Sequence, residues 1–396
     1  MRYILLKFIP LFLLRMYLNF KFFINNFLKK KYKKKYKHKK NNDYKVFNTD
    51  IFYGYHDKIN LINKKLLCHQ KNGNEYFIGF FSDNGEFRRL KNTQLCSWQL
   101  GSQLLWAGKD KVLFNCIIND KPKSALYDLN KKKVIKSFHQ LIYNIDNSYK
   151  KFISINFYDL YKNRSGYGYD LKKYQNDNRY CNQDLKIINI KDGRVLNIIK
   201  KNFILKKFKS YISTKFHFNH ATFSPSGKTI IFFLVDTENS ERKILVFYFN
   251  LLSKKLTLIK KINRISHYCW IDNKSILFTD LGFKNTVNYQ IYNFLNNKIY
   301  PSGLRMKQDG HPMINPKNKN LFVTDTYPNK YGFQKLIVFN LKLKKIIWET
   351  ELYFSTDFLG KSRCDLHPKW DIDGKKIVID YAIKNQRFIR VYDYQV

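Results

Sequence analysis

The chain has 396 residues, of which 44% are hydrophobic and 17% aromatic, so it can bury a sizeable core and is not globally disordered. Six scattered Cys without a CxxC pair exclude a disulfide-dense secreted scaffold and a Cys-type zinc module. The formal net charge is +43. Lys, Asn, Ile, Phe and Tyr are all abundant and have AT-rich codons. Genome composition therefore explains the charge of most of the chain better than a nucleic-acid ligand does.

Residues 1–40 are the exception to this reading. They contain four dispersed Lys or Arg and nine Lys between Lys29 and Lys40, which makes 13 positive charges and no acid. Lys7, Arg15 and Lys21 interrupt an apolar stretch, so neither a transmembrane helix nor a signal peptide fits well. On a helix these three residues share one third of the circumference, which predicts a basic amphipathic helix lying in a membrane surface.

The Lys run after this helix would attract anionic headgroups, by about 1 kcal/mol per Lys near the surface. We therefore expect peripheral attachment through residues 1–40 to the cytoplasmic face of the inner membrane, because Lys-rich segments stay cytoplasmic. The alternatives are a disordered Lys-rich tail, or a poor signal anchor that remains uncleaved and places the protein in the periplasm.

Residues 48–396 contain a repeat of short strands. One unit, Phe223-Ser-Pro-Ser-Gly-Lys-Thr-Ile-Ile-Phe-Phe, joins a strand end, a Pro/Gly turn and an apolar strand. Weaker copies bring the number of units to seven. Each is followed by a further predicted strand, namely Tyr76–Ser82, Ser124–Leu129, Leu185–Ile190, Ile244–Asn250, Tyr289–Phe294, Lys335–Asn340 and Phe388–Tyr394.

Seven units of about 45 residues predict an all-β fold, a seven-bladed β-propeller. A longer spacing between the third and fourth units predicts an insertion near residues 156–183. The alternative is a β-sandwich followed by a second β domain, which does not account for the two matching sets of seven strands.

Histidines recur at one phase of this repeat. The chain has nine His, and the position seven residues before Gly227 is occupied, unit by unit, by His56, Gln103, Ile142, His220, His267, His311 and His367. This phase lies on the strand predicted to line the central channel, so the side chains should converge at one end of the axis. Converging imidazoles suit a divalent metal ion. One ion takes three or four of them, and the sequence favours His220, His267, His311 and His367 as the candidates.

Charged and aromatic side chains accompany these histidines. Arg363 and Arg305 precede His367 and His311 closely and could hold an acidic substrate. Tyr268 follows His267 and is a candidate acid or base. The predicted substrate-binding residues are Arg305, His56, Gln103, Tyr55, and, in the insertion, Tyr167 and Tyr169. The chain has no P-loop, HExxH, GxSxG or Rossmann motif.

The strings Asp309-Gly-His-Pro-Met-Ile-Asn-Pro, Val323-Thr-Asp-Thr-Tyr-Pro and Arg363-Cys-Asp-Leu-His-Pro-Lys-Trp resemble the oligogalacturonate-lyase-like group of seven-bladed propellers. They also resemble propellers from bacterial surface-polysaccharide gene clusters, and the turn repeat resembles the wider TolB/WD40-like class. In the lyase family a divalent metal, often Mn²⁺, neutralises a uronate carboxylate, and a basic residue removes a proton before β-elimination.

The resemblance implies that His311 and His367 are metal ligands and that His220 and His267 are ligands or the base. It implies that Arg363 is the partner of the substrate carboxylate. The family places its ligands within a few residues on one blade, whereas here they are spread one per blade.

Two functions follow from these features. The first is a metal-assisted lyase acting on an acidic, uronate-containing surface polysaccharide. The second is a non-catalytic propeller that binds a glycan or serves as a scaffold in polysaccharide biosynthesis. Nucleic acid is not an expected partner, because the ring of histidines has no part in binding it. The oligomeric state is not predicted.

Overall fold

The computed structural model describes residues 44–394, apart from breaks at 48–49, 83–84, 165, 178–183, 239–242, 263, 283–285, 330–331, 355–356 and 384–385. It also describes four isolated residues between 13 and 20. The predicted amphipathic helix of residues 1–40 therefore lies largely outside the described residues. Among the described residues, no helix is long and apolar enough to cross a bilayer.

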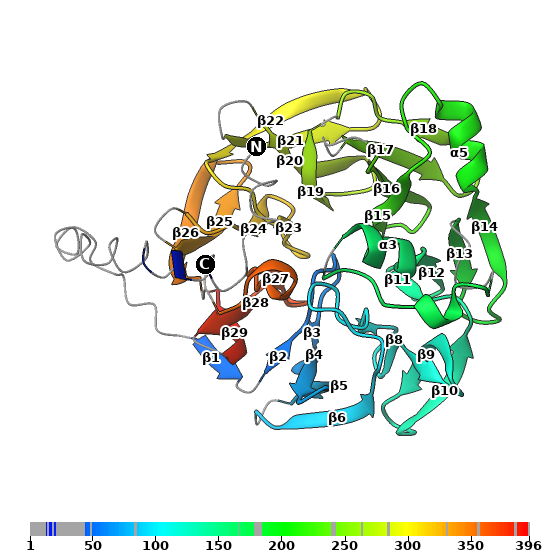
Figure 1. The fold of residues 1–396 in the computed structure, drawn as a ribbon. Coiled ribbons are helices and arrows are strands. Elements are labelled where there is room, and N and C mark those ends of the chain that lie inside the picture. Colours follow the sequence, from blue (N-terminus) through cyan, green and yellow to red (C-terminus); the bar gives the residue numbers. More distant parts are fainter. Residues whose placement is uncertain are drawn as a thin grey trace.

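Seven antiparallel sheets stand around a common axis and form a closed ring, which confirms the predicted seven-bladed propeller (Figure 1). Blade 1 contains β2 (Ile51–Phe52), β3 (Leu61–Ile62), β4 (Lys65–Asn72), β5 (Glu75–Phe81) and β6 (Phe87–Asn92). Blade 2 contains β7 (Leu105–Trp106), β8 (Lys111–Ile118), β9 (Lys121–Asp128) and β10 (Lys133–Phe138). Blade 3 contains β11 (Ile142–Ile145), β12 (Lys151–Ser154), β13 (Leu185–Asn189) and β14 (Val195–Ile199).

The remaining blades follow in chain order. Blade 4 contains β15 (Phe216–Phe223), β16 (Thr229–Asp236), β17 (Lys243–Asn250) and β18 (Leu256–Leu258). Blade 5 contains β19 (Ile265–Trp270), β20 (Ser275–Leu281), β21 (Val287–Asn293) and β22 (Lys298–Met306). Blade 6 contains β23 (Met313–Ile314), β24 (Leu321–Asp325), β25 (Phe333–Asn340) and β26 (Lys345–Tyr353). Blade 7 contains β27 (Lys369–Trp370), β28 (Lys376–Ile383), β29 (Gln386–Asp393) and β1 (Tyr44–Phe47).

The last blade takes its outermost strand from the other end of the chain. Strand β1 pairs antiparallel with β29, with Tyr44 opposite Tyr392 and Phe47 opposite Ile389. This pairing closes the ring and leaves β29 with a partner on each side. Strand β1 was not predicted from the repeat. It is a single outer strand of four residues, and no turn motif of the repeat accompanies it.

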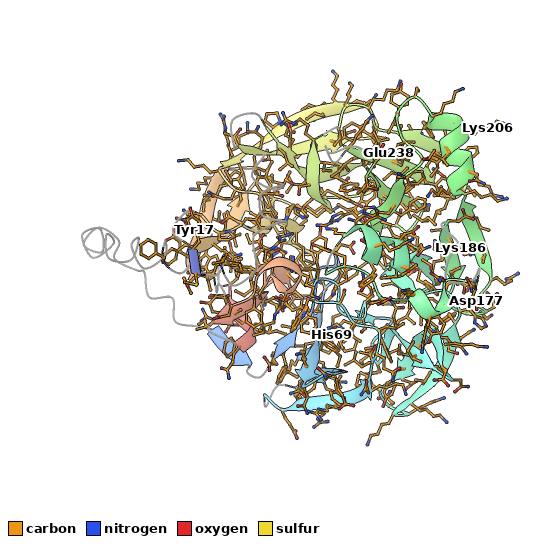
Figure 2. All side chains as sticks on the ribbon, viewed as in Figure 1. Tyr17, His69, Asp177, Lys186, Lys206 and Glu238 are labelled. Atoms are coloured by element: carbon orange, nitrogen blue, oxygen red, sulfur yellow. The ribbon has the colours of Figure 1, made fainter. Side chains whose placement is uncertain are left out.

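Apolar side chains fill the spaces between neighbouring blades. Leu67 and Phe80 of blade 1, for example, pack with Trp106 and Phe114 of blade 2 in one buried cluster. Each blade is therefore held by the burial of its two faces against its neighbours, at about 25 cal/mol per Å² of apolar surface. Figure 2 draws the described side chains on the ribbon, with Lys206 labelled at the outer edge and His69 in blade 1. His69, outside the histidine phase, is a core residue whose Nε2 lies 2.8 Å from the Ser102 Oγ.

Because the strands alternate in direction, the ring has two distinct faces. The hairpin face carries the turns between first and second strands and between third and fourth strands. The insertion face carries the second-to-third connections and the crossings between blades. In blade 3 the second-to-third connection includes α3 (Phe157–Asn163) and η1 (Lys172–Tyr174), which agrees with the predicted insertion. The crossings include α5 (Lys201–Phe208) and η2 (Gly360–Ser362).

Candidate active site on the propeller axis

Four imidazoles gather around one tyrosine ring at the centre of the propeller. The centroid of the Tyr55 ring lies 5.2 Å from that of His220, 5.7 Å from His267, 5.3 Å from His311 and 5.1 Å from His367. Neighbouring imidazoles are 5.6 Å apart between His220 and His267, 4.2 Å between His267 and His311, and 4.4 Å between His311 and His367. All four are buried. The shared phase in the sequence therefore corresponds to a shared position in space.

At several of these equivalent positions the backbone adopts an unusual conformation that sets the direction of the side chain. His220 and His367 have φ of 47° and 42°, and Gln103, at the same phase in blade 2, has φ of 53°. Such left-handed values are uncommon for residues other than glycine. In blade 4 the strand register shifts between Asn219 and Thr222, so His220 lies in a β-bulge. Bulges re-aim side chains next to functional sites.

Tyrosines of the following blade hold two of these backbone turns in place. The Tyr268 hydroxyl donates to the His220 carbonyl oxygen at 2.6 Å, and the Tyr53 hydroxyl donates to the His367 carbonyl oxygen at 2.5 Å. The Tyr268 hydroxyl also lies 2.8 Å from the Thr222 Oγ1. Burial raises the pKa of Tyr268 well above its usual value. The predicted acid–base role of Tyr268 is therefore replaced by a positioning role, because its hydroxyl is committed to protein groups.

Carboxylates orient two of the imidazoles. His311 Nδ1 lies 2.9 Å and 3.0 Å from the two Asp325 oxygens, and Asp325 also accepts the backbone N–H of His311 and that of His367. His267 Nδ1 lies 3.2 Å from the Asp309 Oδ2. A carboxylate at Nδ1 fixes the ring and leaves Nε2 as the ligating atom, which is the usual arrangement behind metal-binding histidines.

The same carboxylates give the imidazoles different proton affinities. Burial alone would lower the pKa of His311, but the carboxylates of Asp325, Asp365 and Asp309 together raise it. Burial, aided by His311, lowers the pKa of His267 and lowers that of His367 well below the usual value. His267 and His367 are therefore neutral near pH 7, and each has a lone pair for a ligand.

These donors fit a divalent metal ion. One ligand atom from each of His311, Asp365 and His367 can be chosen so that all three lie within 4.8 Å of one another. Two imidazoles with nitrogens about 2.1 Å from one ion have ring centroids roughly 4.5–5.5 Å apart. The ring-centroid distances of 4.2 Å between His267 and His311 and 4.4 Å between His311 and His367 are slightly below this range. Among the described residues, His267 does not belong to the group of three whose ligand atoms lie this close together. His220 stands further from the other three.

An arginine–carboxylate pair adjoins the imidazoles. The Arg363 Nε lies 2.7 Å and 2.8 Å from the two Asp365 oxygens, and its guanidinium carbon is 5.0 Å from the centroid of the Tyr327 ring. Asp365 Oδ2 is 3.9 Å from the His367 Nε2. The Tyr327 ring in turn is 5.6 Å from the His311 ring. Arg363 is thus beside the imidazoles, as predicted, but Asp365 already neutralises much of its charge.

The insertion contributes a second arginine that the sequence analysis did not single out. The guanidinium carbon of Arg164 lies 3.8 Å from the centroid of the Tyr167 ring, and its Nη2 donates to the Tyr167 hydroxyl at 3.0 Å. Its Nη1 is buried without a hydrogen-bond partner among the described residues. The charge of Arg164 contributes to lowering the pKa of His267, which places the guanidinium near the imidazoles.

Gln99 ties the insertion to the centre. It accepts the Tyr55 backbone N–H at its carbonyl oxygen and donates its own backbone N–H to Gly166. Its side-chain amide donates to the carbonyl oxygen of Arg363 at 2.8 Å. Tyr169 stacks on Phe157 with centroids 4.6 Å apart, and its hydroxyl contacts the Gly101 carbonyl oxygen at 3.2 Å. Tyr169 therefore supports the insertion from within the core, whereas Tyr167 lies beside Arg164.

A small cavity of about 30 Å³ adjoins the imidazoles, and Tyr55, His56, His311 and His367 are among its lining residues. His56 Nδ1 accepts the Lys58 backbone N–H at 3.2 Å and lies 3.0 Å from the Nζ of the buried Lys369. In a neutral imidazole with Nδ1 as acceptor, Nε2 carries the proton, and this Nε2 is buried without a partner among the described residues. His56 therefore offers a hydrogen-bond donor rather than a metal ligand.

Two predicted site residues are placed differently from the imidazoles. Arg305 is exposed on β22, the outermost strand of blade 5, and lines a separate groove of about 560 Å³ with Lys307 and Lys335. Gln103 is buried, and its Oε1 has no hydrogen-bond partner among the described residues. At this phase blade 3 has Ile142, and the neighbouring Tyr143 accepts the His220 backbone N–H at its hydroxyl.

Comparisons with known proteins agree with this architecture. No family model and no curated protein sequence matches the chain. Among solved structures, oligogalacturonate lyase in complex with manganese matches 88% of this chain and 91% of its own, with a TM-score of 0.59 and 13% identity. The fold is that of the lyase-like propellers.

Two further solved structures also match the chain. Hydrazine synthase from Kuenenia stuttgartiensis matches 89% of this chain and 98% of its own, with a TM-score of 0.52 and 12% identity. TolB from Acinetobacter baumannii matches 84% and 79%, with a TM-score of 0.44 and 11% identity. At these identities the likeness concerns the fold alone, since the function of a propeller depends on the residues at its site.

Proposed function

We propose that the protein is a metal-assisted lyase-like enzyme that acts on an acidic, uronate-containing polysaccharide by β-elimination. The observation that carries the proposal is the gathering of four buried imidazoles on the axis, two of them held by carboxylates. A scaffold needs no such set, and burying polar side chains costs stability unless each has a hydrogen-bond or metal partner. The manganese complex of the structurally similar lyase supports Mn²⁺ as the candidate ion.

In this proposal His267, His311 and His367 hold the ion. The first two have carboxylates at Nδ1, and the lowered pKa values of His267 and His367 leave these two imidazoles with a free lone pair. Because the pKa of His311 is raised, the ion competes with a proton for this imidazole. The bound ion would neutralise the uronate carboxylate and so acidify the neighbouring C–H. Arg164 pairs with the same carboxylate, because its Nη1 has no protein partner among the described residues.

His220 is then the base. It stands apart from the other three imidazoles, and its backbone is fixed by Tyr268 and Tyr143. It takes the proton from C5, the C5–H electrons form the new double bond, and the C4–O bond breaks. His56, whose Nε2 carries the proton, lines the small cavity beside His311 and His367 and is the candidate donor to the leaving oxygen.

The test separates the ligands from the base. We expect His311→Ala to remove the metal from purified protein and to abolish formation of unsaturated uronate, which is followed by ultraviolet absorbance. We expect His220→Ala to retain the metal and to lose turnover by about 10²–10⁴-fold. If the wild-type protein contains no divalent metal and binds uronate oligosaccharides without cleaving them, the glycan-binding alternative replaces the enzyme.

A further inference from the structure

Three consecutive blades carry an exposed leucine at the tip of the same turn. Leu252, Leu295 and Leu343 lie in the turns between the third and fourth strands of blades 4, 5 and 6, and their side chains are 92%, 71% and 56% exposed. Single exposed apolar residues are ordinary on protein surfaces. Here an exposed leucine recurs in the same turn of three adjacent blades, two residues after the capping asparagine in blades 4 and 5 and three residues after it in blade 6. Contiguous apolar surface of this kind marks interaction sites.

The fold does not require leucine at these tips. Each turn is built by an asparagine whose Oδ1 accepts backbone N–H groups of the tip: Asn250 from Leu252, Asn293 from Leu295 and Asn340 from Leu343. Blades 2 and 3 use the same device, since Asp128 caps Asn130 and Lys131 and Asn189 caps Lys191, yet their tips are polar. The turn therefore needs its capping residue and leaves the tip residue free to vary.

Exposed lysines surround the leucine tips. They are Lys254 and Lys255 in blade 4, Lys298 in blade 5, and Lys342, Lys344 and Lys345 in blade 6. Among the described residues, none of these six forms an ion pair with a carboxylate. Apolar tips within a field of uncompensated positive charge match the two layers of an anionic lipid surface, acyl chains and headgroups.

The described chain begins at the same face. Turns between third and fourth strands lie on the hairpin face, and β29 runs toward that face as the third strand of blade 7. Because β1 is antiparallel to β29 and Tyr44 pairs with Tyr392, β1 begins at the hairpin face. Tyr44, which follows the segment with 13 positive charges and no acid in its first 40 residues, thus lies on this face in the blade next to blade 6.

We propose that the hairpin face of blades 4–6 docks onto an anionic membrane surface, with Leu252, Leu295 and Leu343 inserted at the headgroup–acyl boundary. The six lysines pair with headgroup phosphates, and residues 1–40 bind the same bilayer from the adjoining blade. The insertion face, with Arg164 and Tyr167, then points away from the membrane toward a soluble substrate. This docking surface does not depend on the proposed lyase activity.

The direct test reports the environment of each tip in the full-length chain. An environment-sensitive fluorophore is attached at Leu252→Cys or Leu295→Cys in a Cys181→Ser background, with Asn130→Cys as the matched tip of blade 2. On phosphatidylcholine vesicles containing phosphatidylglycerol, we expect a blue shift at positions 252 and 295 and none at position 130. Vesicle-bound protein with all three probes in water would overturn the proposal, as would failure to bind these vesicles.

A second measurement removes the tips without using a probe. We expect Leu252→Ser/Leu295→Ser/Leu343→Ser to weaken cosedimentation with the anionic vesicles by about tenfold, since each leucine contributes a fraction of its burial energy at the interface. The control is Ile135→Thr/Val195→Thr/Ile198→Thr, which removes three equally apolar side chains from the outer strands β10 and β14. Equal weakening by both variants would contradict docking through the hairpin face.

Discussion

The four axial imidazoles are chemically unequal although they occupy one phase of the repeat. Asp325 raises the pKa of His311, while burial lowers the pKa of His267 and His367. The inequality comes from residues outside the repeat pattern, namely one aspartate on β24 and one two residues before His311. Imidazoles at equivalent positions of the repeat therefore differ in proton affinity because their neighbouring carboxylates differ.

Arg164 is expected to act in substrate binding. Replacing it with Met should raise the KM for a uronate oligosaccharide by about tenfold or more, because a charge-assisted pair is lost, with a smaller change in kcat. Arg194→Met is the control, since Arg194 is an exposed arginine paired with Asp192. Partial recovery with Arg164→Lys would support a charge effect. An unchanged KM in Arg164→Met would exclude this role.

Asp380 should make stability depend on pH. Burial raises the pKa of this carboxyl to about 7 in the folded protein, against an ordinary value of 3.8. The unfolded chain loses the proton near pH 4 and the folded chain only near pH 7. The free energy of unfolding therefore falls as pH rises across this window, by a few kcal/mol from this group.

The Asn variant isolates this contribution. Asp380→Asn cannot ionise, so denaturant titrations at pH 5 and pH 8 should show its stability relative to wild type increasing with pH. The constant cost of altering the bonds from Tyr53 and Gly54 cancels in that comparison. A difference that stays the same at both pH values would mean that Asp380 is ionised throughout.

The positions of the histidines could be predicted because a repeat shows which residues occupy equivalent positions in successive blades. Residues at equivalent positions lie at the same height along the propeller axis and point in the same direction. The sequence could not assign Arg164, whose importance depends on where the insertion crosses the ring. It also placed Arg305 at the site from its distance along the chain to His311, whereas β22 carries Arg305 to the outer edge. Proximity in sequence predicts proximity in space only within one turn or strand.

At the scale of elements, the insertion is held by very close backbone approaches. Gly168 has φ of 68°, and a Cβ at this position would lie 2.2 Å from the Phe157 carbonyl oxygen. Gly166 similarly would meet the Lys361 carbonyl oxygen at 2.5 Å. The insertion is therefore fitted between its own helix and the loop before blade 7, which keeps Tyr167 and Arg164 in place.

Gly168→Ala tests this fit. We expect it to destabilise the protein by about 2–4 kcal/mol, because it adds a backbone clash to the strain of a left-handed alanine. Gly73→Ala is a matched control, since Gly73 has φ of 58° and nothing lies within 4 Å of an added Cβ. Gly73→Ala should lower the free energy of unfolding by about 1 kcal/mol. Similar denaturation midpoints for the two variants would show that the insertion can shift to accommodate the added Cβ at little cost in stability.

The seven strands predicted to follow the repeat units are the third strands of the blades, β5, β9, β13, β17, β21, β25 and β29. They could be predicted because their apolar patterns and polar turns are local signals. The closing strand β1 was not predicted. Its partner lies at the other end of the chain, and local patterns contain no information about so distant a pairing.

At the scale of the whole molecule, closure of the ring and the proposed membrane attachment use adjacent parts of the chain. We expect residues 41–396 to unfold at the same denaturant concentration as the full chain. Residues 48–396 lack β1 and should be less stable by about 2–4 kcal/mol, because four residues of strand pairing are lost and β29 becomes an open edge. Equal denaturation midpoints for the two truncated proteins would show that closure of the ring by β1 contributes nothing to stability.

The same truncation at residue 40 also tests the basic segment. Residues 41–396 should bind anionic vesicles much more weakly than the full chain, since 13 positive charges are removed. Raising the salt concentration should also weaken vesicle binding by the full chain, because salt screens the attraction between surface charges. Undiminished vesicle binding by residues 41–396 at low salt would assign the attachment entirely to the propeller.

The pairing of β1 with β29 also sets the order of events during synthesis. Residues 44–47 are made before the other strands of the seven blades, while their partners, Ile389 to Tyr392, are made after the first six blades. The ring therefore cannot close until residues 389–392 have left the ribosome, and the six blades made earlier must wait until then for closure. If residues 1–40 bind lipid as proposed, they can do so before the propeller is complete.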